Sequence, residues 1–376
     1  MTIGKKFGFN MGRMRLSTIT PPQPFGTRGR TPLDLNEGIP KDYMVAMMSV
    51  LLQFRLTISG GTTNGAVAAN APQNLIERFE VSGNHKVYGD WTRYLLQGDH
   101  TYMLPRIRRR LTPLTTVLVA GVATPLSGAI GVYDITVNYF LDFILPEIRP
   151  EEQLFYMLDC PLWNRLNLYT DWGNASNLII GGDRTLALSG YLGVGTNPTT
   201  VVTRFIPKLQ DDRYKLNPIP VKESFRSEKI ESVQADSFVD IINKGNFIRS
   251  LIFASGTIAT GASAPASGGD NFASMADNLF SRIRMKKDDV PQRDIDWTAN
   301  QQYENGRRQG GLLNAVPQGW NILDFCEEET VATAYDTREI ALNNQRLDLF
   351  GDVPTGATGQ RLHMITTELA AVPVFG

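Results

Sequence analysis

Apolar and polar residues alternate over many short stretches of this chain, and this pattern predicts β-strands. Between residues 52 and 58 the apolar positions are separated by Gln53, Arg55 and Thr57. Within Val132–Phe143, apolar or aromatic residues occupy every second position. A period of two places these side chains on one face of a half-buried strand. We expect further strands at Leu75–Val81, Arg165–Tyr169, Thr185–Leu192, Phe247–Ile258, Gly319–Phe325, Arg338–Phe350 and Arg361–Ala370.

Helical segments are expected to be few and short. Pro150 and two following acids precede the segment 153–158, which is long enough for one or two helical turns, and a polar helix is expected over Ile295–Arg308. In each half a short helix thus interrupts a series of strands, which indicates two copies of one β-fold. A proline-rich stretch, 193–220, is interpreted as the connector. With 34 glycines and 21 prolines available for turns, the chain is predicted to be all-β, with two β-sandwiches or barrels.

Composition limits the classes of protein to which the chain can belong. It has 376 residues, enough for about two domains, and is 42% hydrophobic and 20% charged, as is typical of globular proteins. Its longest apolar runs, Met44–Leu52 and Val117–Ala123, are much shorter than the roughly 20 residues of a membrane span. The N-terminus has no continuous apolar run followed by a cleavage site. We therefore expect neither a secreted nor a membrane-spanning protein.

Basic residues are concentrated near the start of the chain. The net charge is −1, yet residues 1–110 contain 15 Lys and Arg against 7 Asp and Glu. The first 33 residues contain no acid, and Pro21, Pro22 and Pro24 oppose a helix there. We interpret residues 1–33 as an extended or conditionally ordered arm that meets an anionic surface, with a simply disordered terminus as the alternative. The basic residues of this arm are Lys5, Lys6, Arg13, Arg15, Arg28 and Arg30.

A second basic cluster occupies residues 106–110. It allows three interpretations: a solvated loop, an intersubunit ion-pair patch, or a contact with a polyanion such as an anionic membrane. Aromatic residues are not interleaved with it, unlike in platforms that bind single-stranded nucleic acid. The candidate side chains are Arg106, Arg108, Arg109 and Arg110.

Residues for catalysis or metal binding are sparse. Cys160 and Cys326 are interpreted as reduced core residues, and three histidines are too few and scattered for a metal centre. The sequence has no phosphate-binding loop, nucleophile elbow or zinc-binding helix motif. Adjacent acids such as Asp211-Asp212 and 327–329 are interpreted as solvated loop charge, with a calcium site as the alternative. We expect no enzymatic activity, no cofactor and no metal.

The order of several segments is more specific than any single motif. After the basic arm, the strand Val132–Phe143 leads through Leu145-Pro146 and a short helix into a strand at Pro161–Tyr169. In the second half, Trp297-Thr298-Ala299-Asn300 opens a polar helix that ends at Arg307-Arg308, and the segment PQGWNILDF follows. In this order of segments, from about Ile39 onward, the chain resembles the double jelly-roll major capsid proteins of tailless, icosahedral, internal-membrane (tectivirus-like) phages.

This resemblance implies an architecture and an assembly. It implies an all-β chain of two eight-stranded jelly rolls with short helices and long loops, at 34–206 and 223–376, joined by a connector at 207–222. Three copies would form a homotrimer of pseudo-hexagonal outline that tiles an icosahedral bacteriophage shell. The arm would face an internal lipid membrane, with Lys5, Lys6, Arg13 and Arg15 against the headgroups.

The same resemblance implies the partners and the location. The partners would be neighbouring capsomers and minor capsid or penton proteins, with no specific nucleic-acid sequence. The protein would act in the virion, after synthesis in the host cytoplasm.

Three other functions stay open. They are another virion structural protein such as a spike or tail component, a jelly-roll carbohydrate-binding or glycan-active protein, and a nucleic-acid-binding module, whose binding would depend strongly on salt. A glycan site would need exposed aromatic residues on a concave face and two opposed acids. The tryptophans are candidates for such aromatics, although core positions are more usual. They are Trp91, Trp163, Trp172, Trp297 and Trp320.

Overall fold

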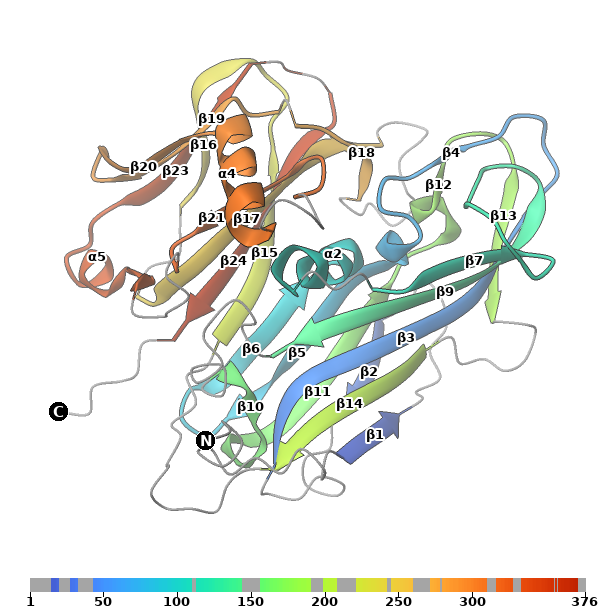
Figure 1. Cartoon of the computed structure of the whole chain (residues 1–376), viewed down its shortest axis with the longest axis horizontal. Coiled ribbons are helices and arrows are strands. Elements are labelled where there is room, and N and C mark those ends of the chain that lie inside the picture. Colours follow the sequence, from blue (N-terminus) through green and yellow to red (C-terminus); the bar gives the residue numbers. More distant parts are fainter. Residues whose placement is uncertain are drawn as a thin grey trace.

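The computed structural model describes most of the chain between Arg15 and Ala370. The described residues are 15–19, 28–32, 43–109, 113–143, 156–190, 199–207, 221–241, 245–259, 271–277, 279–309, 316–326, 333–354, 356 and 358–370. Strands predominate among them and helices are few, as the alternating pattern predicted (Figure 1). No helix in these ranges is long and apolar enough to cross a membrane.

One sheet is built entirely from the first half of the chain. Its strands are β1 (Arg15–Ile19), β3 (Tyr43–Ser59), β7 (Thr115–Val119), β8 (Val122–Ala123), β9 (Gly131–Asp142), β10 (Leu158–Asp159), β13 (Thr185–Gly190) and β14 (Thr199–Pro207). They are arranged in the order β1-β14-β3-β9-β7-β8, and β10 and β13 also pair with β3. The long strand β3 therefore organises the sheet, while β1 and β8 form its two edges.

A second sheet runs through both halves. Its strands are β2 (Arg28–Pro32), β5 (Ile76–His85), β6 (Gly89–Leu96), β11 (Trp163–Trp172), β15 (Val221–Lys229), β17 (Phe247–Ile258), β18 (Phe272–Met275), β21 (Trp320–Asp324), β22 (Tyr335–Asp336) and β24 (Gln360–Leu369). The order is β18-β17-β24-β15-β6-β5-β11-β2, and β21 and β22 pair with β17. The halves join where β6 pairs in parallel with β15.

The remaining elements complete the second half and cover the junction. A four-stranded sheet has the order β16-β23-β19-β20, and β4 pairs with β12. The strand bounds are β16 Gln234–Ile241, β19 Arg282–Lys287, β20 Val290–Asp296, β23 Leu347–Val353, β4 Ala66–Val67 and β12 Ile179–Ile180. The helices are α2 (Gly98–Arg109), α4 (Trp297–Gln309) and α5 (Arg338–Leu342), with short 3-10 turns at Gln73–Leu75, Cys160–Leu162 and Ala175–Asn177.

The core of the first half lies between its own sheet and the strands β5, β6 and β11. Along β3 the apolar side chains from Val50 to Ile58 are fully buried at every second position, so the period read in the sequence is the period of burial. Phe79 on β5 meets Tyr139 on β9 edge to face, with ring centroids 5.1 Å apart. Each large apolar side chain buried in this way contributes roughly 1.5–3 kcal/mol.

The second half has a core of its own. Strands β17 and β24 lie on one side of it and β19 and β23 on the other, with Phe253, Met285 and Leu349 among the buried side chains. Helix α4 contributes Trp297, which stacks on Phe280 with ring centroids 6.1 Å apart. This core and the first one are distinct hydrophobic clusters, as two packed β-units require.

The two halves nevertheless form one continuous structure. The larger hydrophobic cluster contains residues of the second half, including Ile252, Trp320 and Ile365. Figure 1 shows α2 between the two halves, beside the point where β6 and β15 meet. The boundaries at 34–206, 207–222 and 223–376 stay a prediction, and residues 208–220 lie outside the described ranges.

Two expectations about local structure are wrong. The predicted strand Arg338–Phe350 begins as helix α5, because the carboxylate of Asp336 accepts the backbone N–H of Arg338 and opens a helical turn; strand β23 starts only at Leu347. The stretch interpreted as the connector contains strand β14, which lies between β1 and β3. Its β-branched residues favour a strand more strongly than the flanking prolines oppose one.

Two segments of the stretch interpreted as an extended or conditionally ordered arm are strands. Residues Arg15–Ile19 pair with β14, and Arg28–Pro32 pair with β11, so both are edge strands of the two sheets. Residues 153–155 of the expected helix lie outside the described residues, and its last residue, Leu158, begins β10.

Candidate assembly surfaces and the buried seam between the halves

A group of buried charged and polar side chains lies where the two halves meet, and we call this group the seam. Helix α2 and strand β6 carry its members from the first half, while β15 and β24 carry those from the second. Each of its members is at most 9% exposed. The seam consists of Arg93, Asp99, His100 and Arg108 from the first half and of Glu223, His363 and Thr367 from the second.

Glu223 is the centre of the ionic part of the seam. Its carboxylate accepts hydrogen bonds from the guanidinium groups of Arg108 and Arg93, the latter at 3.3 Å. Arg108 also donates to the hydroxyl of Thr367 at 2.7 Å. Burial alone would raise the pKa of Glu223, but the two guanidinium groups outweigh it and hold the pKa below its ordinary value. The carboxylate is therefore ionised, and it ties β15 to both elements of the first half.

Two histidines form the neutral part of the seam. Nε2 of His100 lies 3.0 Å from Nδ1 of His363, so one ring donates a hydrogen bond to the other across the junction. Burial lowers the pKa of His100 to about 3. Burial also lowers the pKa of His363 to about 3, with a further contribution from His100. Both imidazoles are therefore uncharged at neutral pH.

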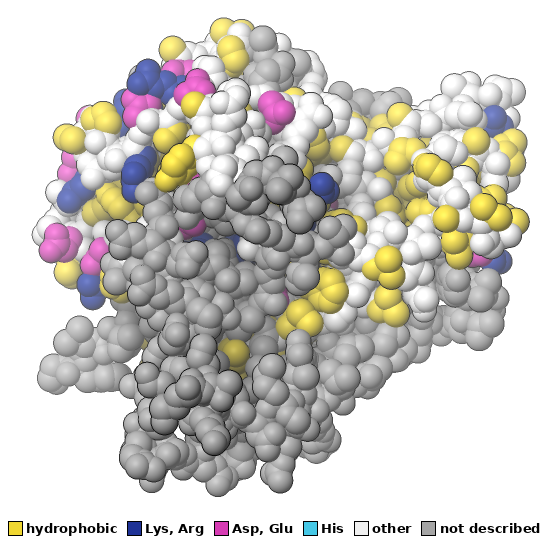
Figure 2. Space-filling view, viewed as in Figure 1, with side chains coloured by type: hydrophobic (Ala, Val, Ile, Leu, Met, Phe, Trp, Pro, Cys, Tyr) yellow, Lys and Arg dark blue, Asp and Glu magenta, His cyan; other side chains and the backbone are white. Residues whose placement is uncertain are grey.

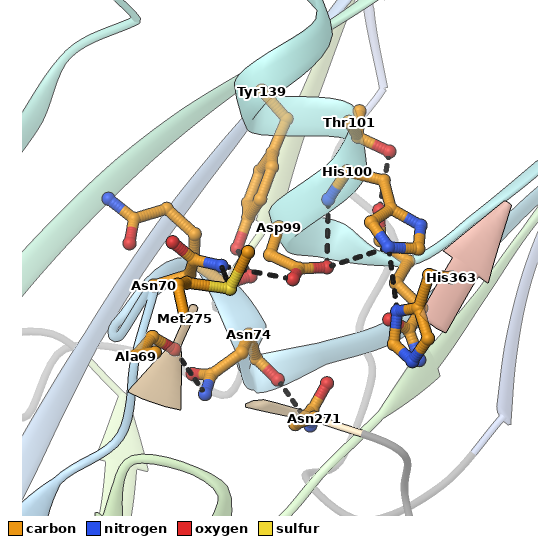
Figure 3. Close-up of polar contacts among 12 residues, drawn as sticks. Ala69, Asn70, Asn74, Asp99, His100, Thr101, Tyr139, Asn271, Met275 and His363 are labelled. Atoms are coloured by element: carbon orange, nitrogen blue, oxygen red, sulfur yellow. Dashed lines mark hydrogen bonds and ion pairs between the residues drawn. The ribbon is translucent and has the colours of Figure 1, made fainter. Parts of the chain in front are cut away.

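Aromatic rings and amides surround the histidine pair. Phe225 meets His100 edge to face at 5.0 Å, and Phe272 lies 4.2 Å from His363 between ring centroids. Close to them, Asn70 donates to the carboxylate of Asp99 at 3.3 Å, as Figure 3 shows. Burial raises the pKa of Asp99, while His363 and hydrogen bonds oppose this shift.

The seam fixes the arrangement of the halves more than it adds to stability. A buried ion pair gains little over well-packed apolar residues, because desolvation offsets its Coulomb energy. Removing one partner is costly, however, because the other charge stays buried and unpaired. The contacts of Glu223 and His363 are made only in one register of α2 against β15 and β24, so we infer that a shifted junction would leave several buried groups unsatisfied.

The sequence reasoning missed this seam, although one signal for it is present. Along β15, Val221 and Glu223 are both fully buried at alternate positions, so the alternation places a carboxylate on an inward-facing position. A charged residue at such a position needs a partner, and Arg93 and Arg108 provide it. Nothing in the sequence pairs His100 with His363, which lie 263 positions apart.

The basic cluster at 106–110 is divided by the structure. Residues 106–109 belong to helix α2, not to a loop. Arg108 points inward to Glu223 and is unavailable to a polyanion or another subunit, so the surface interpretation is wrong for this residue. Arg106 is partly buried, the side chain of Arg109 is outside the described set, and Arg110 itself lies outside the described residues. A contact role for the remaining members stays a prediction.

The basic residues of the arm are brought onto two different sheets. Arg15 lies opposite Phe205 at the β1 edge. Arg28 and Arg30 lie on β2, opposite Asp171 and Tyr169. Lys5, Lys6 and Arg13 are outside the described residues. A membrane or assembly contact of these side chains stays a prediction.

Other candidate residues lie in the core or outside the described ranges. Both cysteines are buried, as expected. Four of the tryptophans are at most 5% exposed, namely Trp163, Trp172, Trp297 and Trp320, and Trp91 is partly buried. Within the described ranges no group of three or more His, Cys, Asp or Glu is placed to hold a metal ion. The acid pairs at 211–212 and 327–329 are not among the described residues.

Comparison with known proteins places the chain by its fold alone. No protein-family model matches the sequence, and no curated protein matches it. Solved structures do match: the fold is the double jelly roll of the major capsid proteins of icosahedral viruses, as the sequence predicted. The exact number of strands in each roll is not confirmed.

Three of these structures represent different viruses. The structure of Sulfolobus turreted icosahedral virus matches with a TM-score of 0.59 and 13% identity over 94% of this chain and 90% of that chain. The major capsid protein P2 of bacteriophage PM2 matches with a TM-score of 0.55 and 11% identity over 96% and 99%. The Faustovirus major capsid protein matches with a TM-score of 0.53 and 9% identity over 95% and 90%.

Proposed function

We propose that this chain is the major capsid protein of an icosahedral virus and builds its capsid shell. One observation carries the proposal: the likeness to capsid proteins spans nearly the whole length of both chains, including the junction between the two halves. A fold alone does not determine a function. A match over both jelly rolls and the junction between them is, however, more informative than a match to one jelly roll.

The internal construction fits this role. The shared sheet and the buried seam join the two halves, and a shell needs such a fixed arrangement in order to repeat the same contacts at every position. Four of the five tryptophans that a glycan-binding face could use are buried in the core, and Trp91 is partly buried. This burial favours a structural role over the carbohydrate-binding alternative, and the proposed protein is not an enzyme.

The finer features of the proposal follow from the resemblance. Three copies form a capsomer of pseudo-hexagonal outline, and capsomers contact one another and minor capsid or penton proteins. The arm lies on the inner side of the shell, where Lys5, Lys6, Arg13 and Arg15 meet an internal lipid membrane. The two jelly rolls comprise 34–206 and 223–376, and synthesis takes place in the host cytoplasm.

Light scattering of the purified protein at moderate salt tests the proposal. We expect a mass three times the 41.7 kDa of the chain, with no dissociation on dilution. Electron microscopy of the same sample should show particles of hexagonal outline. A monomer at every concentration would refute the capsomer model, and glycan-binding assays would then be the next measurement.

A further inference from the structure

Charged residues are missing from four long stretches of the first half. Residues 56–76, 111–133, 172–182 and 185–203 contain no Asp, Glu, Lys or Arg. Soluble proteins usually carry about 25–35% charged residues on their surface. Stretches of this length without charge are expected in a core, but several of these residues lie at the surface, as the structure shows below.

These stretches come together at one end of the first half. Gly131 pairs with Ile58, Ile180 pairs with Ala66, and Thr185 pairs with Ser59. At Gly128 even a Cβ atom would meet the backbone oxygen of Gly65 at 2.0 Å, so the two loops touch. We call this region, made of the described residues 56–76, 113–133 and 172–190, the neutral end. In Figure 1 it is the right-hand end of the molecule, around β4, β12 and the β7–β8 turn.

The only charged residues in the neutral end, Asp183 and Arg184, are bound within the chain. The Asp183 carboxylate accepts the backbone N–H groups of Thr62 and Thr63 at 2.8 and 2.6 Å. The Arg184 guanidinium donates to the backbone oxygens of Gly60 and Gly61. Both charges fasten the loop at 60–64 to the start of β13, and the exposed Asp183 is balanced by the adjacent Arg184, so the pair leaves no net charge at this end.

Large apolar side chains are nevertheless exposed at the neutral end. Val122 is 66% exposed, Ile130 61% and Val132 42%. Figure 2 shows hydrophobic side chains gathered at the right-hand end of the molecule, with few charged ones among them. Exposed apolar surface without charge is typical of the centre of a protein interface, where charged residues are depleted.

The β19–β20 hairpin in the second half shows the opposite composition. Nine of the fifteen residues in 282–296 are charged. Its turn has positive φ at Asp288 and Asp289, and Val290 follows with 60% exposure. The β7–β8 turn is built in the same way, with positive φ at Ala120 and Gly121 before Val122. The two hairpins thus share geometry and differ in charge.

We propose that the neutral end packs against a second copy of this chain within the capsomer, an inference that rests on the proposed function. A surface whose charges are bound internally offers nothing to an anionic or cationic partner, so nucleic acid and charged membranes are poor occupants. A threefold axis gathers the neutral ends of three identical copies, so that one flank of each neutral end meets the opposite flank of the neutral end on the next copy. A cyclic trimer repeats one such contact three times.

Two matched pairs of variants test this contact. Val122→Asp places a charge at the neutral end, and Val290→Asp places the same charge at an equally exposed position in the charged hairpin. We expect Val122→Asp to reduce the mass from three copies to one copy of 41.7 kDa, while Val290→Asp keeps the trimer. As separated single chains, the two variants and the wild type should have the same melting temperature. Both substituted positions face solvent in the single chain, so neither change should disturb its fold.

Cysteine labelling provides a second readout that does not depend on a disruptive change. Because Cys160 and Cys326 are buried, a maleimide should react mainly with an introduced cysteine. In the assembled protein we expect Val122→Cys to react much more slowly than Val290→Cys. Dilution into mild denaturant that separates the copies should remove the difference.

The outcomes separate this inference from the proposed function. A trimeric wild type in which Val122→Asp also stays trimeric and Val122→Cys reacts as fast as Val290→Cys would overturn the inference and leave the capsid proposal intact. A monomeric wild type would overturn both. If Val122→Cys is protected only after phosphatidylcholine vesicles are added, the neutral end binds lipid and the inference is wrong.

Discussion

Acid should weaken the junction between the halves through the histidine pair of the seam. Burial lowers the pKa of His100 and of His363 from 6.5 to about 3. Below pH 6.5 the unfolded chain therefore binds more protons than the folded chain. The free energy of unfolding is largest above pH 6.5 and decreases as the pH falls from 6.5 towards the pKa of about 3 in the folded chain. Each histidine changes the free energy of unfolding by about 1.4 kcal/mol per pH unit, or about 2 kcal/mol at pH 5.

Other groups that face the histidine pair also change how the stability depends on pH. Burial raises the pKa of Asp99, so this carboxyl favours the folded state on acidification and offsets part of the loss. Arg361 lowers the pKa of His363 and acts in the same direction as burial. The rings that contact the pair, such as Phe225, Trp320 and Phe272, carry no charge. Between pH 6.5 and 5 the two histidines should therefore dominate the local change.

The assay compares slopes instead of absolute stabilities. We would measure urea unfolding at a fixed protein concentration from pH 6.5 to 5, for the wild type and for His363→Gln, which can still hydrogen-bond His100. The slope of the unfolding free energy against pH should be smaller in the variant by about 1.4 kcal/mol per pH unit. His85→Gln is the control outside the seam and should change the slope less, because Asp159 opposes the burial that lowers the pKa of His85. Equal slopes for the wild type and His363→Gln would refute the reasoning.

Two further predictions concern the seam and the N-terminal strands. Glu223→Gln leaves two buried guanidinium groups without a counter-charge and should lower the unfolding free energy by about 3–5 kcal/mol. The control Asp336→Asn removes one charge of an exposed ion pair and should lower it by under about 1 kcal/mol. Similar losses for the two variants in urea titrations would contradict the central role of the Glu223 carboxylate. Deletion of residues 1–33 should lower the melting temperature further than deletion of residues 1–14, because only the longer deletion removes β1 and β2. Equal melting curves would show that these edge strands add no stability.

Two strands that are buried on both faces could be predicted closely from the sequence. The bounds expected for Phe247–Ile258 are those of β17, and the expected strand Arg361–Ala370 is β24 to within one residue at each end. In both, several neighbouring strands supply partners, so local preference and tertiary pairing agree. Strand β14 was missed because its evidence is not local. Proline and glycine surround it, and only its place beside β3 makes it a strand.

The seam could be predicted only in part, for a similar reason. An inward position for Glu223 is readable from the alternation along β15, but the identity of its partners is not. Arg108 belongs to a run of basic residues, and nothing in the run distinguishes the member that turns inward. The inward direction follows from the start and phase of α2, which tertiary packing determines.

Charge is used in opposite ways at the two places that matter for the proposed shell. In the seam, charged groups are buried and paired. We infer that the two halves can pack in one register alone, because any other register would leave Glu223 or its arginine partners without a hydrogen-bond partner. At the neutral end the charged residues are one adjacent pair of opposite sign, Asp183 and Arg184, so few charged groups have to be desolvated when another surface covers it. A fixed register inside each copy also fixes the direction in which its neutral end points. The buried ion pairs thereby determine the geometry of a contact in which they take no part.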